Sequence, residues 1–156
     1  MDNIRYAQIN GVEIRDMKDL PGEEVLYSGS LYLDGREIGT IEEDPEGGPI
    51  SLDVFPRYEE VLKSRINDYV RAMALEEGEI PHRDVFFLDL IDMQIFYDMY
   101  REGLSEGYMC LVVDASGEDL EIYSVQSEEE VENLVREKDL SDFEVYASPT
   151  DFIVSC

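Results

Sequence analysis

The amino-acid sequence predicts an α+β fold with a mostly antiparallel sheet, two central helices and a C-terminal ββαβ segment. Residues 1–55 alternate between apolar and polar positions around short turn sequences, which is typical of strands. Residues 56–105 change to apolar spacings of three and four, which is typical of amphipathic helices. Residues 106–156 return to alternation around one capped helix. Because strands and helices are grouped rather than alternating, this order favours α+β architecture.

The first 55 residues are expected to form five strands separated by turn-favouring residues: Ile4–Ile9, Val12–Met17, Val25–Leu33, Arg36–Glu42 and Ile50–Phe55. Two of the connections are Asn10-Gly11 and Asp34-Gly35. Such dipeptides favour type I′ turns, because both central residues of that turn need a positive φ. We therefore expect two tight hairpins, with Pro21-Gly22 interrupting the chain between them.

A first amphipathic helix is predicted to begin at Pro56, because proline suits the first turn of a helix. Its apolar face is formed by residues three or four apart: Tyr58, Val61, Leu62, Ile66, Tyr69, Val70 and Met73. Gly78 is expected to end this helix, since glycine readily takes the left-handed conformation of a helix C-terminus.

A second helix is predicted from Asp84, whose side chain can cap it, to about Glu102, with Gly103 as its terminator. This helix is apolar around most of its circumference, which indicates a central position. Its first residues, Val85–Leu88, are also compatible with a short strand.

The C-terminal third predicts a hairpin, a helix and a further strand. Tyr108–Val113 and Leu120–Val125 are the expected hairpin strands, and Phe143–Ala147 is the later strand. Ser127 and Glu130 have the spacing of a capping box, which marks a helix start. We expect one acidic domain over residues 1–156. The alternative is a subdivision into a β-rich region (residues 1–55), a helical region (residues 56–105) and a ββαβ region (residues 106–156).

The charge of the chain is its most unusual property. Thirty-eight Asp and Glu oppose 12 Lys and Arg, which gives a net charge of -26 over 156 residues. The chain is nevertheless 44% hydrophobic and contains ten Tyr and six Phe, a composition that supports a folded core. Self-repulsion at this charge destabilises a compact state. The sequence therefore calls for a compensating partner, a bound cation or a saline environment.

No leader, membrane-spanning or cysteine pattern is recognisable. Met1–Arg5 leads directly into alternation without an apolar segment, and no run approaches 18 apolar residues. The two cysteines are too few for a disulfide framework or a zinc site. We expect a cytoplasmic protein that does not bind membranes.

The sequence offers no catalytic or cofactor-binding motif. His82 is the only histidine, and Cys110 lies within an apolar strand where a small buried side chain is expected. Phosphate-binding and dinucleotide-binding glycine motifs are absent. The acidic loop 42–48 lacks the spacing of an EF-hand, although weak binding of a divalent cation there stays open. We expect neither enzymatic activity nor a cofactor.

The charge itself suggests the function. Twenty-six net charges correspond to about 44 Å of duplex DNA, and a domain of this length is about 39 Å across. Acidic inhibitors of restriction enzymes and of RNA-guided nucleases exploit such charge densities. We therefore expect a DNA-mimicking inhibitor of a basic nucleic-acid-binding protein, which does not bind nucleic acid itself. Two alternatives stay open, an acidic immunity or adaptor protein that binds one basic protein, and adaptation to high salt.

The expected partner contacts are acids of the loop and of two exposed helix faces. They are Glu42, Glu43, Asp44, Glu46, Glu59, Glu60, Asp68, Glu128, Glu129 and Glu132. A homodimer would lengthen the acidic surface but would also bring like charges together.

Overall fold

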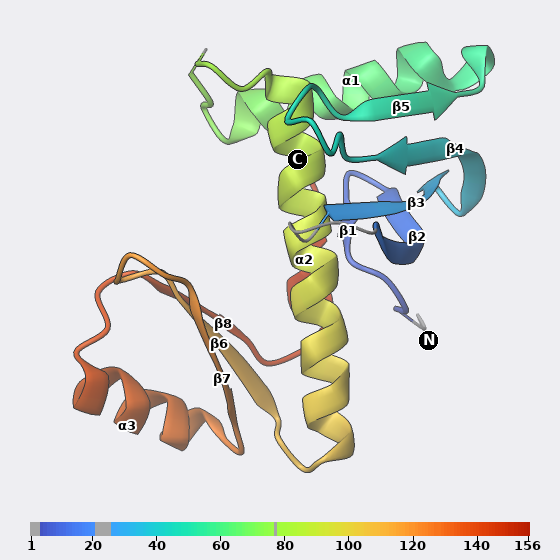
Figure 1. The fold of residues 1–156 in the computed structure, drawn as a ribbon. Helices are drawn as coiled ribbons and strands as arrows, with labels where there is room; N and C mark the ends of the chain where they lie inside the picture. The colour runs from blue at the N-terminus through green and yellow to red at the C-terminus, as the bar shows by residue number, and fades with distance from the viewer. Residues whose placement is uncertain (1–3, 21–25, 77) are drawn as a thin grey trace. The chain divides into compact units, whose positions relative to one another are not determined.

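The computed structural model describes residues 4–20, 26–76 and 78–156 (Figure 1). Within these residues, three α-helices and nine strands form an α+β fold with mostly antiparallel sheets, which confirms the predicted fold class. The chain divides into two compact units. Unit 1 comprises Met1–Gln94 with Ile153–Cys156, and unit 2 comprises Ile95–Phe152. The predicted break at Pro21-Gly22 and the predicted strand start at Val25 lie outside the described residues, and the expected single domain stays a prediction.

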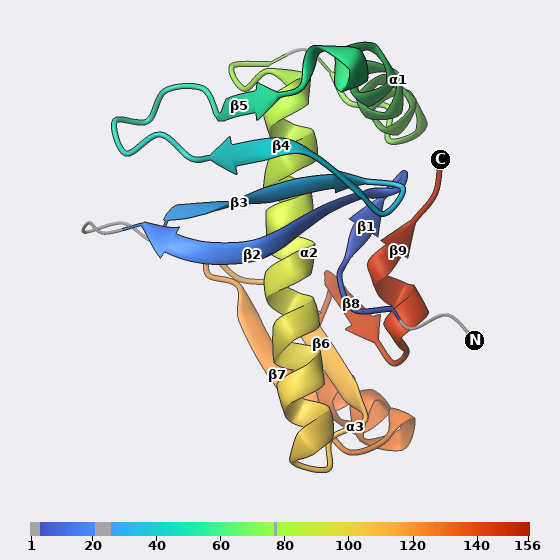
Figure 2. The same cartoon turned by 90° about the vertical axis from the view of Figure 1, so that its right-hand side faces the viewer.

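The sheet of unit 1 has the strand order β5-β4-β3-β2-β1-β9 (Figure 2). Its strands are β1 (Gln8–Ile9), β2 (Val12–Leu20), β3 (Leu26–Leu33), β4 (Arg36–Glu42), β5 (Ser51–Val54) and β9 (Ile153–Val154). Neighbours pair antiparallel, except that β1 and β9 pair parallel. Thus a two-residue strand near the C-terminus, which the sequence does not predict, completes the edge of the N-terminal sheet.

Both predicted hairpin turns are present in unit 1. The φ angles are 51° and 80° at Asn10 and Gly11, and 50° and 85° at Asp34 and Gly35. Arg65 joins the two turns, because its guanidinium donates hydrogen bonds to the Asn10 carbonyl and to the Asp34 carboxylate. The Asn10 amide group donates in return to the Arg65 carbonyl at 2.9 Å, and its oxygen accepts from the Cys156 N–H at 2.7 Å.

Helix α1 (Pro56–Ala72) begins at the predicted proline but ends before Gly78. Its C-terminal turn is closed by the Ala74 N–H on the Arg71 carbonyl and the Leu75 N–H on the Val70 carbonyl, with Ala74 at a φ of 51°. This is the hydrogen-bond pattern of a Schellman motif, formed here without glycine. Met73, predicted to lie on the apolar face, is therefore the exposed C-cap residue.

Helix α2 (His82–Ser105) extends further at both ends than predicted, and Val85–Leu88 is helical. Asp84 lies inside the first turn instead of capping it, and its carboxylate accepts the Ile50 N–H at 3.1 Å. Gly103 is not the terminator. The Tyr108 N–H donates to the Gly103 carbonyl and Gly107 takes a φ of 96°, so Gly107 provides the left-handed residue of the terminating Schellman motif.

Unit 2 contains the C-terminal half of α2, a three-stranded sheet and helix α3 (Glu128–Lys138). The sheet order is β7-β6-β8, formed by Glu121–Val125, Cys110–Asp114 and Phe143–Tyr146, and the 3-10 turn η1 (Pro149–Phe152) follows. Val131 of α3 packs with Cys110 and Val112 of β6 in one hydrophobic cluster. The ring of Phe152 stacks on Tyr146 at 4.3 Å between ring centres. The predicted ββαβ segment is present.

Candidate partner-binding surfaces

The negative charge is denser in unit 2 than in unit 1. Unit 2 holds 16 Asp and Glu against three Lys and Arg in 58 residues, and unit 1 holds 22 against nine in 98 residues. Each unit therefore has a net charge of -13. Because unit 2 is the smaller, its surface carries more uncompensated charge per unit area.

The loop that follows β4 uses some of its acidity to fold. The Glu43 carboxylate accepts the Tyr27 N–H at 2.8 Å. The Asp44 carboxylate accepts the N–H groups of Glu46 at 2.9 Å and Gly48 at 3.1 Å. Of the predicted contacts in this loop, Glu42 and Glu46 are exposed and form no such bond among the described residues. They are the better candidates for a partner, whereas Glu43 and Asp44 have structural roles.

Helix α1 presents two of its three predicted contacts freely. Glu59 and Glu60 are exposed in the first two turns. Asp68 instead pairs with Arg71 one turn later at 3.3 Å, so its charge is partly compensated. The fourth acid near this helix, Glu76, follows its last turn, and Glu77 lies outside the described residues.

Helix α3 offers the most regular acidic surface. Glu128, Glu129 and Glu132 are exposed, and none of them forms an ion pair with a described residue. Ser127 caps the helix by accepting the Glu130 N–H at 3.3 Å, and the Glu130 carboxylate accepts the Gln126 N–H at 3.0 Å. The N-terminal carboxylates also benefit from the positive end of the helix dipole. Their location therefore costs the free protein little.

The end of α2 carries two acids that sequence reasoning missed. Glu102 lies in the last turn and Glu106 directly follows it, and both are exposed. Carboxylates are unfavourable at a helix C-terminus, because the helix dipole is negative there. This violation of a local rule was visible in the sequence. It marks these residues as candidates for a role other than stability.

These two acids border a small hollow within unit 2. The hollow has a volume of about 290 Å³, and its walls include Met99, Leu111 and Ile122 beside Glu102 and Glu106. Met99 is 39% exposed. Apolar walls suit the methylene stem of Lys or Arg, and carboxylates suit its charged end. The arrangement can therefore receive a basic side chain from a partner.

The thiol of Cys110 shows no sign of activation as a nucleophile. Cys110 is buried in β6, and burial, together with Glu128 and Asp151, raises the pKa of its thiol. A nucleophilic cysteine needs the opposite shift.

Among the described residues, no group of three His, Cys, Asp or Glu side chains is arranged to hold a metal ion. None of the described helices combines the length and apolar character needed to span a membrane.

Comparison with known proteins gives no relatives. No protein-family model matches the chain, and no curated protein or solved structure is significantly similar to it.

Proposed function

We propose that this protein is a non-enzymatic acidic inhibitor that binds a basic nucleic-acid-binding protein in the cytoplasm and occupies the surface that would otherwise hold DNA. Such an activity is of the anti-restriction or anti-CRISPR type. The observation that carries this proposal is the large excess of exposed carboxylates that pair with no cation of the described chain, which is densest in unit 2.

The magnitude of the charge supports the comparison with DNA. A compact body of 58 residues has a diameter of about 27 Å by the size scaling of folded chains. The 13 net charges of unit 2 correspond to about 22 Å of duplex. Unit 2 and duplex DNA therefore carry a similar charge per unit length. A groove lined by Lys and Arg would attract either of them. Binding would release counterions and weaken as salt is added.

The hollow at the end of α2 favours a second candidate function. Its apolar walls and two acids, Glu102 and Glu106, can select a single Lys or Arg side chain by shape as well as by charge. A protein that recognises its partner in this way is an immunity or adaptor protein for one basic protein. It need not compete with DNA.

The test is capture of basic nucleic-acid enzymes at low salt, followed by competition with duplex DNA. For the DNA-mimic function, captured enzymes are released by DNA and inhibited in proportion to occupancy. A single partner that stays bound at high salt and ignores DNA supports the second function. Failure to bind any nucleic-acid enzyme or other basic protein contradicts both.

Charge-matched variants separate a defined surface from general attraction. The triple variant E128Q/E129Q/E132Q removes three exposed carboxylates from one helix. The control E37Q/E76Q/E79Q removes three exposed carboxylates elsewhere in the chain. A DNA-mimicking surface on α3 predicts a clearly larger loss of affinity for the first variant. Equal losses would show that only the total charge matters.

A further inference from the structure

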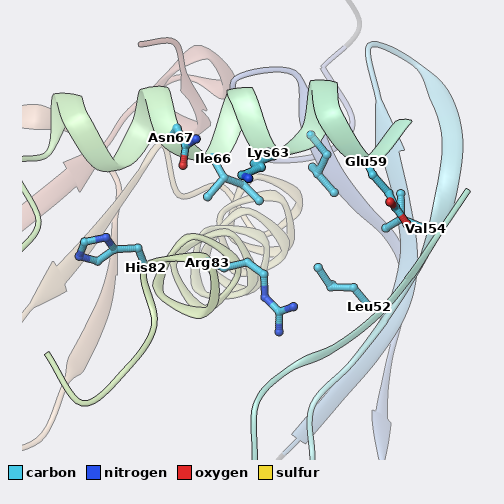
Figure 3. A pocket seen from close by; sticks show the side chains of 9 residues that line it. Leu52, Val54, Glu59, Lys63, Ile66, Asn67, His82 and Arg83 are labelled. Carbon is cyan, nitrogen blue, oxygen red and sulfur yellow. The ribbon is translucent and has the colours of Figure 1, made fainter. Parts of the chain in front are cut away.

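Unit 1 contains a pocket whose chemistry differs from that of the acidic surface. It has a volume of about 440 Å³ and lies between β5, α1 and the beginning of α2 (Figure 3). Its apolar walls are formed by Leu52, Val54, Leu62 and Ile66. Volume and lining are in the range of small-molecule sites, which are mostly apolar with a few polar groups.

The polar groups of this pocket are mainly cationic. Lys63 of α1 and Arg83 of α2 both line it, with His82 and Asn67 beside them. Figure 3 shows the carboxylate of Glu59 next to Val54, on the side of the pocket away from His82. In a chain with three times as many acids as Lys and Arg, a pocket lined by two cations and one carboxylate is unusual. Arg83 also forms an ion pair with the buried Asp84 carboxylate at 3.1 Å, so Lys63 is the cation of this lining that no described acid compensates.

Arg83 is held in position by bonds that leave some of its guanidinium available. Nη2 donates to the Ile50 carbonyl, and Nε and Nη2 donate to the Asp84 carboxylate at 3.2 and 3.1 Å. No bond to a described residue uses Nη1. The ammonium group of Lys63 likewise forms no ion pair with a described residue. The Lys63 ammonium group and the Nη1 group of Arg83 thus remain available as donors at the apolar wall.

His82 supplies a further unsatisfied group. Its Nε2 atom is buried and has no hydrogen-bond partner among the described residues. Buried polar atoms in native proteins nearly always have a partner. An ordered water would supply one.

From these observations we propose that the pocket binds a small amphipathic carboxylate, with its apolar body on Leu52, Leu62 and Ile66 and its carboxylate between Lys63 and Arg83. The net charge of the protein makes this selectivity informative. A charge of -26 attracts cations and repels anions at long range. Preference for an anion can therefore come only from the local arrangement of charges. This site is separate from the acidic surface of α3, and Glu59 is the residue that it shares with the expected partner contacts.

The experiment compares octanoate with octylammonium, which share an apolar chain and differ in the sign of the head group. Calorimetric titration at physiological ionic strength is expected to show tighter binding of octanoate. Amide chemical shifts should change around Leu52, Ile66 and His82. The variant K63Q should weaken octanoate binding about threefold, the effect of one partly exposed ion pair. E59Q should strengthen it.

The control K18Q removes an identical charge from β2, away from the pocket lining. It should leave octanoate affinity unchanged. The proposal is overturned if octylammonium binds as tightly as octanoate, if octanoate causes no shifts around the pocket, or if K63Q and K18Q behave alike. Circular dichroism of each variant verifies that the fold is retained.

Discussion

The two acids at the end of α2 should destabilise the free protein. The change to test is E102Q/E106Q, which replaces both carboxylates by amides of similar shape. A charge near a helix end contributes about 0.3–1 kcal/mol, unfavourable for an acid at the C-terminus. For two residues, we expect the free energy of unfolding to rise by about 1 kcal/mol, together with some relief of general repulsion.

A second variant in the same unit isolates the helix-dipole contribution. E128Q/E129Q removes two carboxylates from the N-terminal turn of α3, where they are stabilising, and leaves the cap formed by Ser127 and Glu130 intact. Both variants lose two negative charges, so relief of general repulsion is similar in each. The free energies of unfolding of the two variants should therefore differ by about 1–2 kcal/mol, with E102Q/E106Q the more stable.

The assay is urea denaturation followed by far-ultraviolet circular dichroism, because the chain has no Trp. Urea is uncharged and leaves electrostatic interactions unscreened. The difference should shrink in 1 M salt, where the screening length is about 3 Å. If the two variants are equally stable at low salt, or if E128Q/E129Q is the more stable, Glu102 and Glu106 do not destabilise the helix end as argued. If they do, E102Q/E106Q should also bind a basic partner less tightly than the parent protein.

Three further changes test the structure. N10A should lower the free energy of unfolding by about 3 kcal/mol in urea denaturation, because two side-chain hydrogen bonds are lost and alanine disfavours a φ of 51°. N10G loses the same hydrogen bonds but tolerates this φ, so its free energy of unfolding should fall by about 1 kcal/mol less. Equal losses for the two variants would contradict the role of backbone conformation. At the helix ends, A74G should stabilise the protein and G107A should destabilise it, each by about 1 kcal/mol, since both residues have a positive φ. Thermal melts in which both variants shift the melting temperature in the same direction would contradict this. Partial desolvation, with Asp89 and Glu43 nearby, raises the pKa of Asp92 in the folded protein. Its charged form therefore opposes folding at neutral pH, so D92N should be more stable than the parent there and lose that advantage as the pH falls through the raised pKa; an advantage independent of pH would contradict this.

Local signals in the sequence were sufficient for much of the fold. Asn10-Gly11 and Asp34-Gly35 identify their turns because few residues tolerate two successive positive φ angles. The start of α3 follows from Ser127 and Glu130. The predicted ends of α1 and α2 are wrong, because they rest on the nearest glycine as the terminator. Helix α1 is closed instead at Ala74, which forms the Schellman hydrogen bonds although alanine disfavours the positive φ that they require.

Strand β9 could not be predicted, since two residues show no periodicity and their pairing depends on the distant β1. The candidate site was predictable only as a set of acids. Which carboxylates support the loop backbone, as Glu43 and Asp44 do, depends on the folded path of the chain. Glu102 could have been selected from the sequence, because the predicted helix already ended near it, whereas Glu106 required the observed end at Ser105.

The pairing of β9 with β1 has a consequence for biosynthesis. Unit 2 is inserted between two segments of unit 1, and residues 153–156 contribute both a strand and the amide that binds Asn10. On the ribosome, the N-terminal sheet therefore stays incomplete until these residues have been translated and have left the exit tunnel. The inserted unit has all its residues available earlier. The order of folding is thus expected to run against the order of synthesis, with the unit begun first being finished last.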